Sequence, residues 1–518
     1  MASPQHTSLF CILLSTLFTT VITSCKDHPN IMVIALDDLG WADFQSHDPL
    51  MVTPNIRRLR EEGMFLNQSY VLPSCVPSRA ALMTGRYPHT FGLQDGKAIT
   101  EDTNFYLNEN LTILPQELKR LNPLYQTHMV GKWHLGHCHP GLYPQARGFD
   151  SFYGILLGGH QSFYYHNATG NIYDFQDGDS VDLSANGTYT TDLFHTRAKK
   201  ILEEDIDYTK PFFFYMSYYA AHKPFEVPQA YRDQYCSHVT NDTRQIHCAM
   251  VARADDSIGQ LLQVLKDKNV YENTTILLLS DNGGPALTGS SVNWPLRGTK
   301  QTLYEGGTRS YTIFKAPGLA ATNVTWPGMI HAIDWLPTLV NAAGGTTPGY
   351  VHGKNLWPNL KYNAPSSRTE FIYAVNDLAK KDNSAYRYNE WKLIKGKPGP
   401  TKKCGWFPPY QLLLNQSYPW GLDGTTLETE NALYNIETDP EERNNVYSDP
   451  ANANIVYTIE DQIKNYMGVP RGKQGLYPLQ PIALHKLPPG KNVDANGVLA
   501  TCTCHPAGVP ASSVCSSD

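Results

Sequence analysis

The most constraining feature of this sequence is a series of short apolar runs that each end in polar residues. Residues 31–36 form one such run, which ends in Asp37-Asp38, and residues 274–280 form another, which ends in Asp281-Asn282. Runs of this length predict buried strands. Segments with helical spacing of apolar residues, such as residues 247–270, lie between them. Strands that alternate with helices indicate an α/β fold with a largely parallel sheet.

The polar residues that follow these runs are expected to meet. In a parallel sheet, ligands bind outside the carboxyl ends of the strands. Segments that are far apart in the sequence would therefore converge on one edge of the sheet. The residues expected there are Asp37, Asp38, Lys132, His134, His222, Asp281 and Asn282.

The two acidic pairs at this edge favour a metal site. Asp37-Asp38 and Asp281-Asn282 offer only oxygen ligands, three carboxylates and one amide. This set suits a hard divalent cation, calcium or magnesium, better than zinc. Either pair alone would as readily cap a helix or a turn, and it is the presence of both that favours metal.

Three basic residues are further candidates for the same site. Lys132 and His134 lie in an extended segment, where residues two apart face the same side. Lys300 lies in a basic segment after Asp281-Asn282 and could supply a cation to an anionic ligand. Taken singly, a solvated lysine or a histidine at the edge of the core remains the simpler interpretation of each.

The N-terminus predicts entry into the secretory pathway. Residues 9–22 form an apolar run of signal-peptide length followed by small residues, so we expect residues 1–24 to be a signal peptide. No other stretch is long and apolar enough to span a membrane. The formal charge of −6 does not suggest a nucleic-acid-binding surface. A secreted or lysosomal protein is expected.

Sequons for N-glycosylation agree with this route. Eight Asn-X-Ser/Thr triplets occur, a density that suits a protein surface made in the secretory pathway. The acceptor residues are Asn67, Asn110, Asn167, Asn186, Asn241, Asn273, Asn323 and Asn415.

The ten cysteines leave one without an obvious role. Cys236 and Cys248 flank a polar loop and form the natural local disulfide. Cys138 lies in a loop that is expected to contain a disulfide, and the remaining pairings stay open. Cys75 instead lies in a basic turn at the start of a predicted helix, where the helix N-terminus and Arg79 would lower the pKa of a thiol. A disulfide or a buried thiol are the alternatives.

The style of the sequence changes near residue 360. Residues 369–375, 384–396 and 431–446 predict short antiparallel strands, and residues 454–468 predict a closing helix. We therefore expect a catalytic α/β domain over residues 25–360 and a smaller C-terminal α+β domain over residues 361–518, with an irregular tail that contains cysteines.

The segment around Cys75 resembles the sulfatase signature. Residues 75–79, CVPSR, followed by TGR at residues 84–86, match Cys-X-Pro-Ser-Arg and its tail. Nearly the whole chain resembles this family, and the animal arylsulfatase B-like (N-acetylgalactosamine-4-sulfatase-like) branch in particular. The segments that carry the resemblance are DDLGW, THMVGKWHLG, AHKPF, SDNGG, NWPLRGTK, DWLPTLV, WFPP and DPEER. The resemblance implies an alkaline-phosphatase-like sulfatase fold with a large, mostly parallel mixed sheet.

The resemblance also implies an activity. In sulfatases the signature cysteine is converted to Cα-formylglycine by a formylglycine-generating enzyme, and the hydrated aldehyde attacks the sulfur of a sulfate monoester to give a covalent sulfo-enzyme. Carried over, Cys75 is the modified residue. The single Ca²⁺ would be bound by Asp37, Asp38, Cys75, Asp281 and Asn282.

The remaining roles carry over residue by residue. Lys132, His222 and Lys300 would contact the sulfate oxygens, and His222 or Lys300 would protonate the leaving oxygen. Arg79 would orient the nucleophile, and His134 would assist its proton transfers. A sulfated sugar is the implied substrate, with small aryl sulfates as surrogates, and the oligomeric state is open.

Two other functions were weighed against a sulfatase. A phosphatase or phosphonate hydrolase of the same superfamily would generally use Ser or Thr with two zinc ions, whereas this chain has Cys75 and one set of oxygen ligands. A catalytically silent glycoprotein derived from a sulfatase would be expected to lack Cys75, Arg79 or a metal residue, and all are present.

Overall fold

The computed structural model describes residues 28–94, 99–100, 105–159, 161–168, 172–374, 383–409 and 431–468. The predicted signal peptide, the sequon at Asn415 and Cys25, Cys502, Cys504 and Cys515 lie outside these residues. No helix in the described part is long and apolar enough to cross a membrane.

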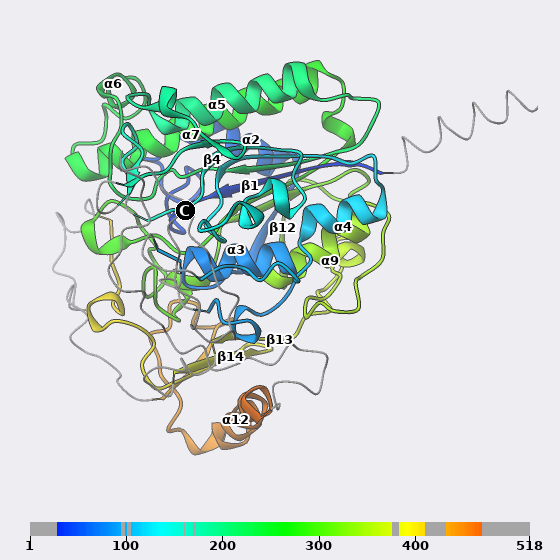
Figure 1. The fold of residues 1–518 in the computed structure, drawn as a ribbon. Helices are drawn as coiled ribbons and strands as arrows, with labels where there is room; N and C mark the ends of the chain where they lie inside the picture. The colour runs from blue at the N-terminus through cyan, green and yellow to red at the C-terminus, as the bar shows by residue number, and fades with distance from the viewer. Residues whose placement is uncertain are drawn as a thin grey trace, which may run out of the picture.

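A ten-stranded mixed sheet forms the centre of the molecule (Figure 1). Five neighbouring strands, β10, β1, β9, β3 and β4, run parallel, while β11 is antiparallel to both of its neighbours. The full order is β12 (Val324–His331), β2 (Met64–Tyr70), β11 (Thr312–Lys315), β10 (Thr274–Ser280), β1 (Asn30–Leu36), β9 (Phe212–Ser217), β3 (Gln126–Lys132), β4 (Ser151–Ile155), β7 (Gln176–Asp177) and β8 (Ser180–Val181). The predicted α/β fold with a mostly parallel sheet is confirmed.

Helices cover both faces of this sheet, as Figure 1 shows. Every residue of β1 is buried, and its side chains alternate between two apolar cores, one on each face. This explains why its sequence is continuously apolar. One core includes residues of α2 (Pro54–Glu62), α5 (Thr190–Lys200) and α7 (Asp242–Asp267). The other includes residues of α3 (Cys75–Thr84), α4 (Leu114–Leu121) and α9 (Trp335–Ala342).

The C-terminal part forms a separate four-stranded antiparallel sheet, as predicted. Its order is β13 (Glu370–Ala374), β14 (Ser384–Tyr388), β15 (Trp391–Lys395) and β16 (Ala432–Asn435). Helix α12 (Ala453–Gly468) packs against it, with Ile459 and Ile463 buried. The boundary near residue 360 stays a prediction, because both sheets contribute side chains to one continuous core.

The cysteines in the described residues fall into two groups. Cys236 and Cys248 form the predicted disulfide, and Cys138 is also disulfide-bonded. Cys75 and Cys404 are free and buried. Cys75 is therefore a thiol in this structure, so the disulfide alternative is wrong for it.

Candidate active site

The two acidic pairs meet at the carboxyl edge of the sheet. Asp37-Asp38 directly follows β1, and Asp281-Asn282 directly follows β10, its parallel neighbour. The backbone N of Asp38 donates to Asp281 Oδ1 at 3.2 Å, and Asn282 Nδ2 donates to Asp38 Oδ1 at 2.7 Å. Asp38 has a φ of 62°, a left-handed conformation that is uncommon for residues other than glycine and recurs at functional sites.

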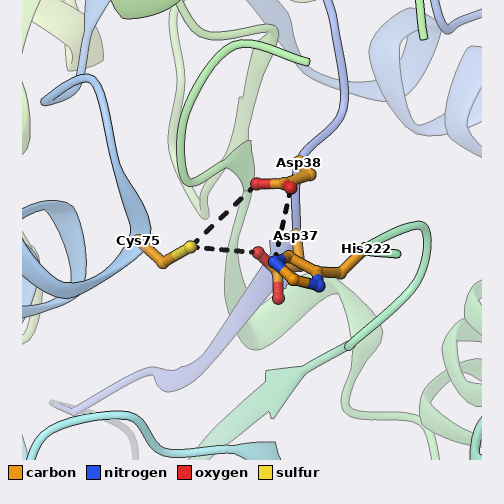
Figure 2. Close-up of side chains that lie close together, drawn as sticks. All are labelled: Asp37, Asp38, Cys75 and His222. Carbon is orange, nitrogen blue, oxygen red and sulfur yellow. Dashed lines mark hydrogen bonds and ion pairs between the residues drawn. The ribbon is translucent and has the colours of Figure 1, made fainter. Parts of the chain in front are cut away.

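Cys75 and His222 face these carboxylates, as Figure 2 shows. One ligand atom from each of Asp37, Asp38, Cys75 and His222 lies within 4.8 Å of the others. Cys75 Sγ is 3.5 Å from Asp37 Oδ1 and 4.0 Å from Asp38 Oδ1. His222 Nε2 is 3.5 Å from Asp38 Oδ2. Cys75 reaches this position because it opens helix α3, which follows the carboxyl end of β2.

Two buried lysines complete the ring around the thiol. Lys300 Nζ is 3.2 Å from Cys75 Sγ and 2.6 Å from Asp38 Oδ1. Lys132 Nζ is 2.5 Å from Asp37 Oδ2 and donates to the backbone O of Gly158 at 3.0 Å. The interpretation of either lysine as a solvated surface residue is wrong, because Lys132 is fully buried and Lys300 nearly so.

Arg79 forms hydrogen bonds with several of the elements that build this site. It lies one helical turn after Cys75 in α3, and its Nε donates to Asp281 Oδ2 at 2.9 Å. Its Nη1 donates to Ser217 Oγ at 2.5 Å and to the backbone O of Lys132 at 3.1 Å. The guanidinium thus fixes the ends of β3, β9 and β10 relative to the helix that carries the thiol.

Neither His134 nor His222 lies on the strand to which the sequence analysis assigned it. Strand β9 ends at Ser217, so His222 belongs to the following turn, where its Nδ1 lies 2.7 Å from the backbone O of Lys223. Strand β3 ends at Lys132, and His134 lies beyond it with a φ of 57°. The two-residue alternation of a strand therefore does not extend to His134.

Burial sets the protonation of the thiol and the histidines. It raises the pKa of Cys75 to about 12, although Lys132 and Lys300 act in the opposite direction. The helix N-terminus was expected to lower this pKa, but desolvation of the thiolate outweighs it. Burial also holds the pKa values of His134 and His222 well below the ordinary value, so both rings are neutral.

The pKa values of Asp281 and Asp38 shift in opposite directions because the two carboxylates have different neighbours. Burial raises the pKa of Asp281 to about 6, and the nearby charge of Asp37 adds to the rise. Burial acts upward on Asp38 as well, but the positive charges of Lys300 and Lys132 outweigh it, so the pKa of Asp38 lies far below its ordinary value. Carboxylates this close together need compensating positive charge.

The donor set fits a hard cation. Asn282 uses its amide nitrogen towards Asp38 and Gly283, which leaves Oδ1. This oxygen is buried and has no hydrogen-bond partner among the described residues. A buried acceptor without a donor is costly, and cation coordination would satisfy it. With three carboxylates beside it, the chemistry is that of an oxygen-ligated divalent ion.

Several residues that shape this site were not found from the sequence. Ser217 and Tyr215 accept hydrogen bonds from Arg79, and the ring of Tyr219 stacks on that of His222 with the centroids 5.1 Å apart. These residues lie within or after an all-buried strand, so no periodicity separates them from core residues. Gly158 also shapes the site, because a Cβ at this position would lie 2.0 Å from Lys132 Cε. Only this close approach identifies it, and no sequence pattern does so.

Comparisons with known proteins bear on this arrangement. Residues 29–345 match the family model described as Sulfatase. Mouse arylsulfatase J is 34% identical over 445 residues, which cover 81% of this chain and 73% of the relative. Human N-acetylgalactosamine-6-sulfatase is 29% identical over 393 residues, which cover 70% of this chain and 72% of the relative.

A solved structure shows the same architecture. The crystal structure of Ps i-CgsB superposes with a TM-score of 0.71 at 27% identity and covers 87% of this chain and 94% of its own. The same protein has also been solved in complex with k-i-k-neocarrahexaose. The matched family model spans β1, β10, Cys75 and Lys300, and thus every residue of the buried cluster described above. This chain belongs to the sulfatase family and is an arylsulfatase-like sulfuric ester hydrolase.

Proposed function

We propose that this sulfatase is calcium-dependent and uses a formylglycine nucleophile derived from Cys75. The observation that carries the proposal is the position of Cys75 Sγ, 3.5 Å from Asp37 and 3.2 Å from Lys300. The thiol thus lies beside both an oxygen ligand and a cation, where a bound sulfate group would meet both. Burial raises the pKa of the Cys75 thiol to about 12, which disfavours the thiolate and supports a different nucleophile at this position.

The chain's own oxygen atoms would hold the ion. Asp37, Asp38, Asp281 and Asn282 converge from two neighbouring strand ends, and Asn282 Oδ1 is available to a cation. A bound calcium would polarise the sulfate oxygens and offset the charge of the ester. Oxygen-only ligands favour calcium over zinc.

Cations in the site would stabilise the charge that develops on the sulfate oxygens. Lys132 Nζ contacts Asp37 and Lys300 Nζ contacts Asp38, so both ammonium groups are held in place. Donors that are fixed before the reaction cost no reorganisation during it. Arg79 would orient residue 75 from the same helix, through the network that holds its guanidinium rigid.

Proton transfer would fall to the neutral histidines. Nε2 of His222 faces the site, because Nδ1 is occupied by the backbone O of Lys223. Nε2 of a neutral His222 whose Nδ1–H donates to Lys223 carries no proton, so this atom would protonate the leaving oxygen only after it has taken up a proton, whereas the ammonium of Lys300 already carries one. His134 Nδ1 is buried without a hydrogen-bond partner among the described residues and could accept a proton from the nucleophile.

A sulfated sugar is the substrate class that the relatives support. Human N-acetylgalactosamine-6-sulfatase is named for a sulfated sugar, and Ps i-CgsB has been solved in complex with k-i-k-neocarrahexaose. We infer that this chain likewise hydrolyses a sulfate ester on a sugar and accepts small aryl sulfates as surrogates.

The test combines mass spectrometry with sulfate release. Protein from a eukaryotic secretory host should carry residue 75 about 18 Da lighter than cysteine, the difference between a thiol and an aldehyde at the nucleophile position. It should release sulfate from 4-nitrophenyl sulfate, lose this activity with a calcium chelator and regain it with added calcium. An unmodified thiol in an active preparation would overturn the formylglycine mechanism. Turnover of 4-nitrophenyl phosphate in place of the sulfate would favour the phosphatase alternative.

A further inference from the structure

We propose that a lysine-rich loop of the C-terminal sheet forms a second binding site for the negative charges of an extended sulfated sugar. The inference rests on the proposed function and narrows its substrate to an anionic oligosaccharide or polysaccharide. The loop follows β15, and its lysines Lys397, Lys402 and Lys403 are called the basic rim.

The charge of this loop is one-sided. Residues 391–409 contain five lysines and no acidic residue. Two of the five are already compensated, because Lys392 is buried against two glutamates and Lys395 Nζ lies 2.7 Å from Glu460. Lys397 and Lys402 are exposed and form no ion pair with any described residue. Lys397 and Lys402 therefore give the basic rim positive charge that no described residue neutralises.

The loop packs directly against the active-site segment. Lys403 Nζ donates to Gln301 Oε1 at 2.8 Å, and Leu303 N donates to Pro398 O at 2.7 Å. The approach is close, since a Cβ on Gly399 would lie 2.6 Å from the backbone O of Gln301. Lys403 thus touches the residue next to Lys300 in the chain.

The same segment contacts the turn that presents Cys75. Gln301 N donates to the backbone O of Pro73 at 2.7 Å, two residues before Cys75. Hydrogen bonds therefore lead without a gap from the basic rim, through Gln301, to the turn that carries the nucleophile position. The rim borders the active site and is not a remote surface.

The burial of the site places its opening on this side. The side chain of Lys300 is 11% exposed, whereas those of Asp37 and Lys132 are 0% exposed. Lys300 is thus nearest to solvent among the charged groups that face Cys75. A large ester that reaches the thiol past Lys300 would carry the rest of its chain over Gln301 and onto the basic rim.

The chemistry of the rim selects a polyanion. Lysine ammonium groups are compact charges on flexible stems and suit sulfate or carboxylate groups that vary in position. A small aryl sulfate carries one negative charge, and this charge is bound inside the site. An oligosaccharide that carries a sulfate or carboxylate on each of several sugars places further charges outside it, and these are attracted by the rim over about one Debye length.

Competition against a small substrate tests this. Wild-type enzyme and the variant Lys397→Gln/Lys402→Gln hydrolyse 4-nitrophenyl sulfate in the presence of a chondroitin sulfate hexasaccharide, which competes whether it is cleaved or only bound. We expect the variant to raise the inhibition constant of the hexasaccharide about tenfold, the loss of two exposed ion pairs. The KM for 4-nitrophenyl sulfate should change much less. Lys397→Arg/Lys402→Arg should restore the wild-type inhibition constant.

A matched pair of lysines provides the control. Lys199 and Lys200 are likewise two lysines of one segment, at the end of helix α5, and Lys199→Gln/Lys200→Gln should leave both constants unchanged. Raised salt should weaken the hexasaccharide in the wild type more than in the rim variant. Unsulfated chondroitin hexasaccharide separates carboxylate from sulfate recognition.

The outcomes separate this inference from the proposed function. If the wild type is not inhibited by the hexasaccharide, or if the rim and control variants weaken inhibition equally, the rim is not a substrate site. The sulfatase mechanism then still stands. If formylglycine-containing wild type fails to hydrolyse 4-nitrophenyl sulfate at all, the proposed function fails first.

Discussion

Two buried clusters of charge in this protein look alike but differ in how they are compensated. The active site holds Asp37, Asp38 and Asp281 against Arg79, Lys132 and Lys300. A second cluster lies where the two sheets meet, and in it Lys392 Nζ is 2.9 Å from Glu305 Oε1 and 2.8 Å from Glu442 Oε1. Arg387 and Tyr70 enclose it further.

The difference shows what marks a functional site. In the second cluster the lysine is shared by two carboxylates and the described residues around it include no thiol, so its pairing joins the two sheets. In the active site, a thiol lies among the charges and Asn282 Oδ1 has no described partner. Buried charge alone is thus a poor indicator of function, and available ligand atoms beside a nucleophile are a better one.

The largest effect should separate the two free buried cysteines. Cys75→Ala should lower turnover of 4-nitrophenyl sulfate by at least about 10⁴-fold, because it removes the proposed nucleophile. Thermal unfolding should change little, since Cys75 forms no disulfide. Cys404→Ala, the matched control, should retain activity in its folded fraction. A Cys75→Ala protein that remains active would end the assignment of residue 75.

The second cluster should respond in stability instead. Lys392→Met should lower the free energy of unfolding by about 3 to 5 kcal/mol, because it leaves Glu305 and Glu442 buried without their cation. Denaturant titration measures the loss. Specific activity of the remaining folded enzyme should stay close to wild type. A loss of kcat in fully folded protein would mean that this cluster also positions the catalytic segment.

Lys132→Met should show the opposite pattern. Its ammonium is one of the fixed donors of the site, so kcat should fall about 10²- to 10³-fold. The loss of stability should be smaller than for Lys392→Met, because Arg79 remains 3.8 Å from Asp37 and compensates part of its charge. Steady-state kinetics and denaturant titration on the same preparation test both statements. Equal losses of stability in the two variants would remove the distinction between the clusters.

Much of the active site could be predicted because it depends on chain direction alone. Once β1 and β10 are identified as parallel neighbours, Asp37 and Asp281 must lie at the same edge. The position of Lys300 is different. It follows no strand of the parallel set, and it reaches Cys75 through an irregular segment that hydrogen-bonds to the loop after β15. The resemblance to sulfatases assigned it, and no local pattern did so.

The junction between the sheets could not be predicted from the sequence. Glu305, Lys392 and Glu442 come from three segments, and each would normally be assigned to the solvent. Their burial depends on mutual pairing in three dimensions, which sequence periodicity does not record. The order of the outer strands was also not predicted, because the antiparallel insertion of β11 between β2 and β10 depends on long-range pairing.

The smallest expected effect is a pH dependence of stability that belongs to the second cluster. Burial raises the pKa of Glu442 to about 7 from an ordinary value of 4.5, although Lys392 opposes the rise. Because the folded protein binds this proton more tightly than the unfolded chain, the resulting stabilisation is complete below about pH 4.5. It is lost as the pH rises through about 7.

Glu442→Gln should remove this dependence, since an amide does not titrate. The range from pH 5 to pH 8 brackets the raised pKa of Glu442. Over this range the free energy of unfolding of the wild type should fall by about 1 to 3 kcal/mol relative to that of the variant. Glu460→Gln removes a carboxylate that pairs with Lys395 near the surface, and its profile should run parallel to the wild type. Parallel profiles for Glu442→Gln and the wild type would show that Glu442 is ionised throughout. The two clusters would then hold their carboxylates in the same charge state.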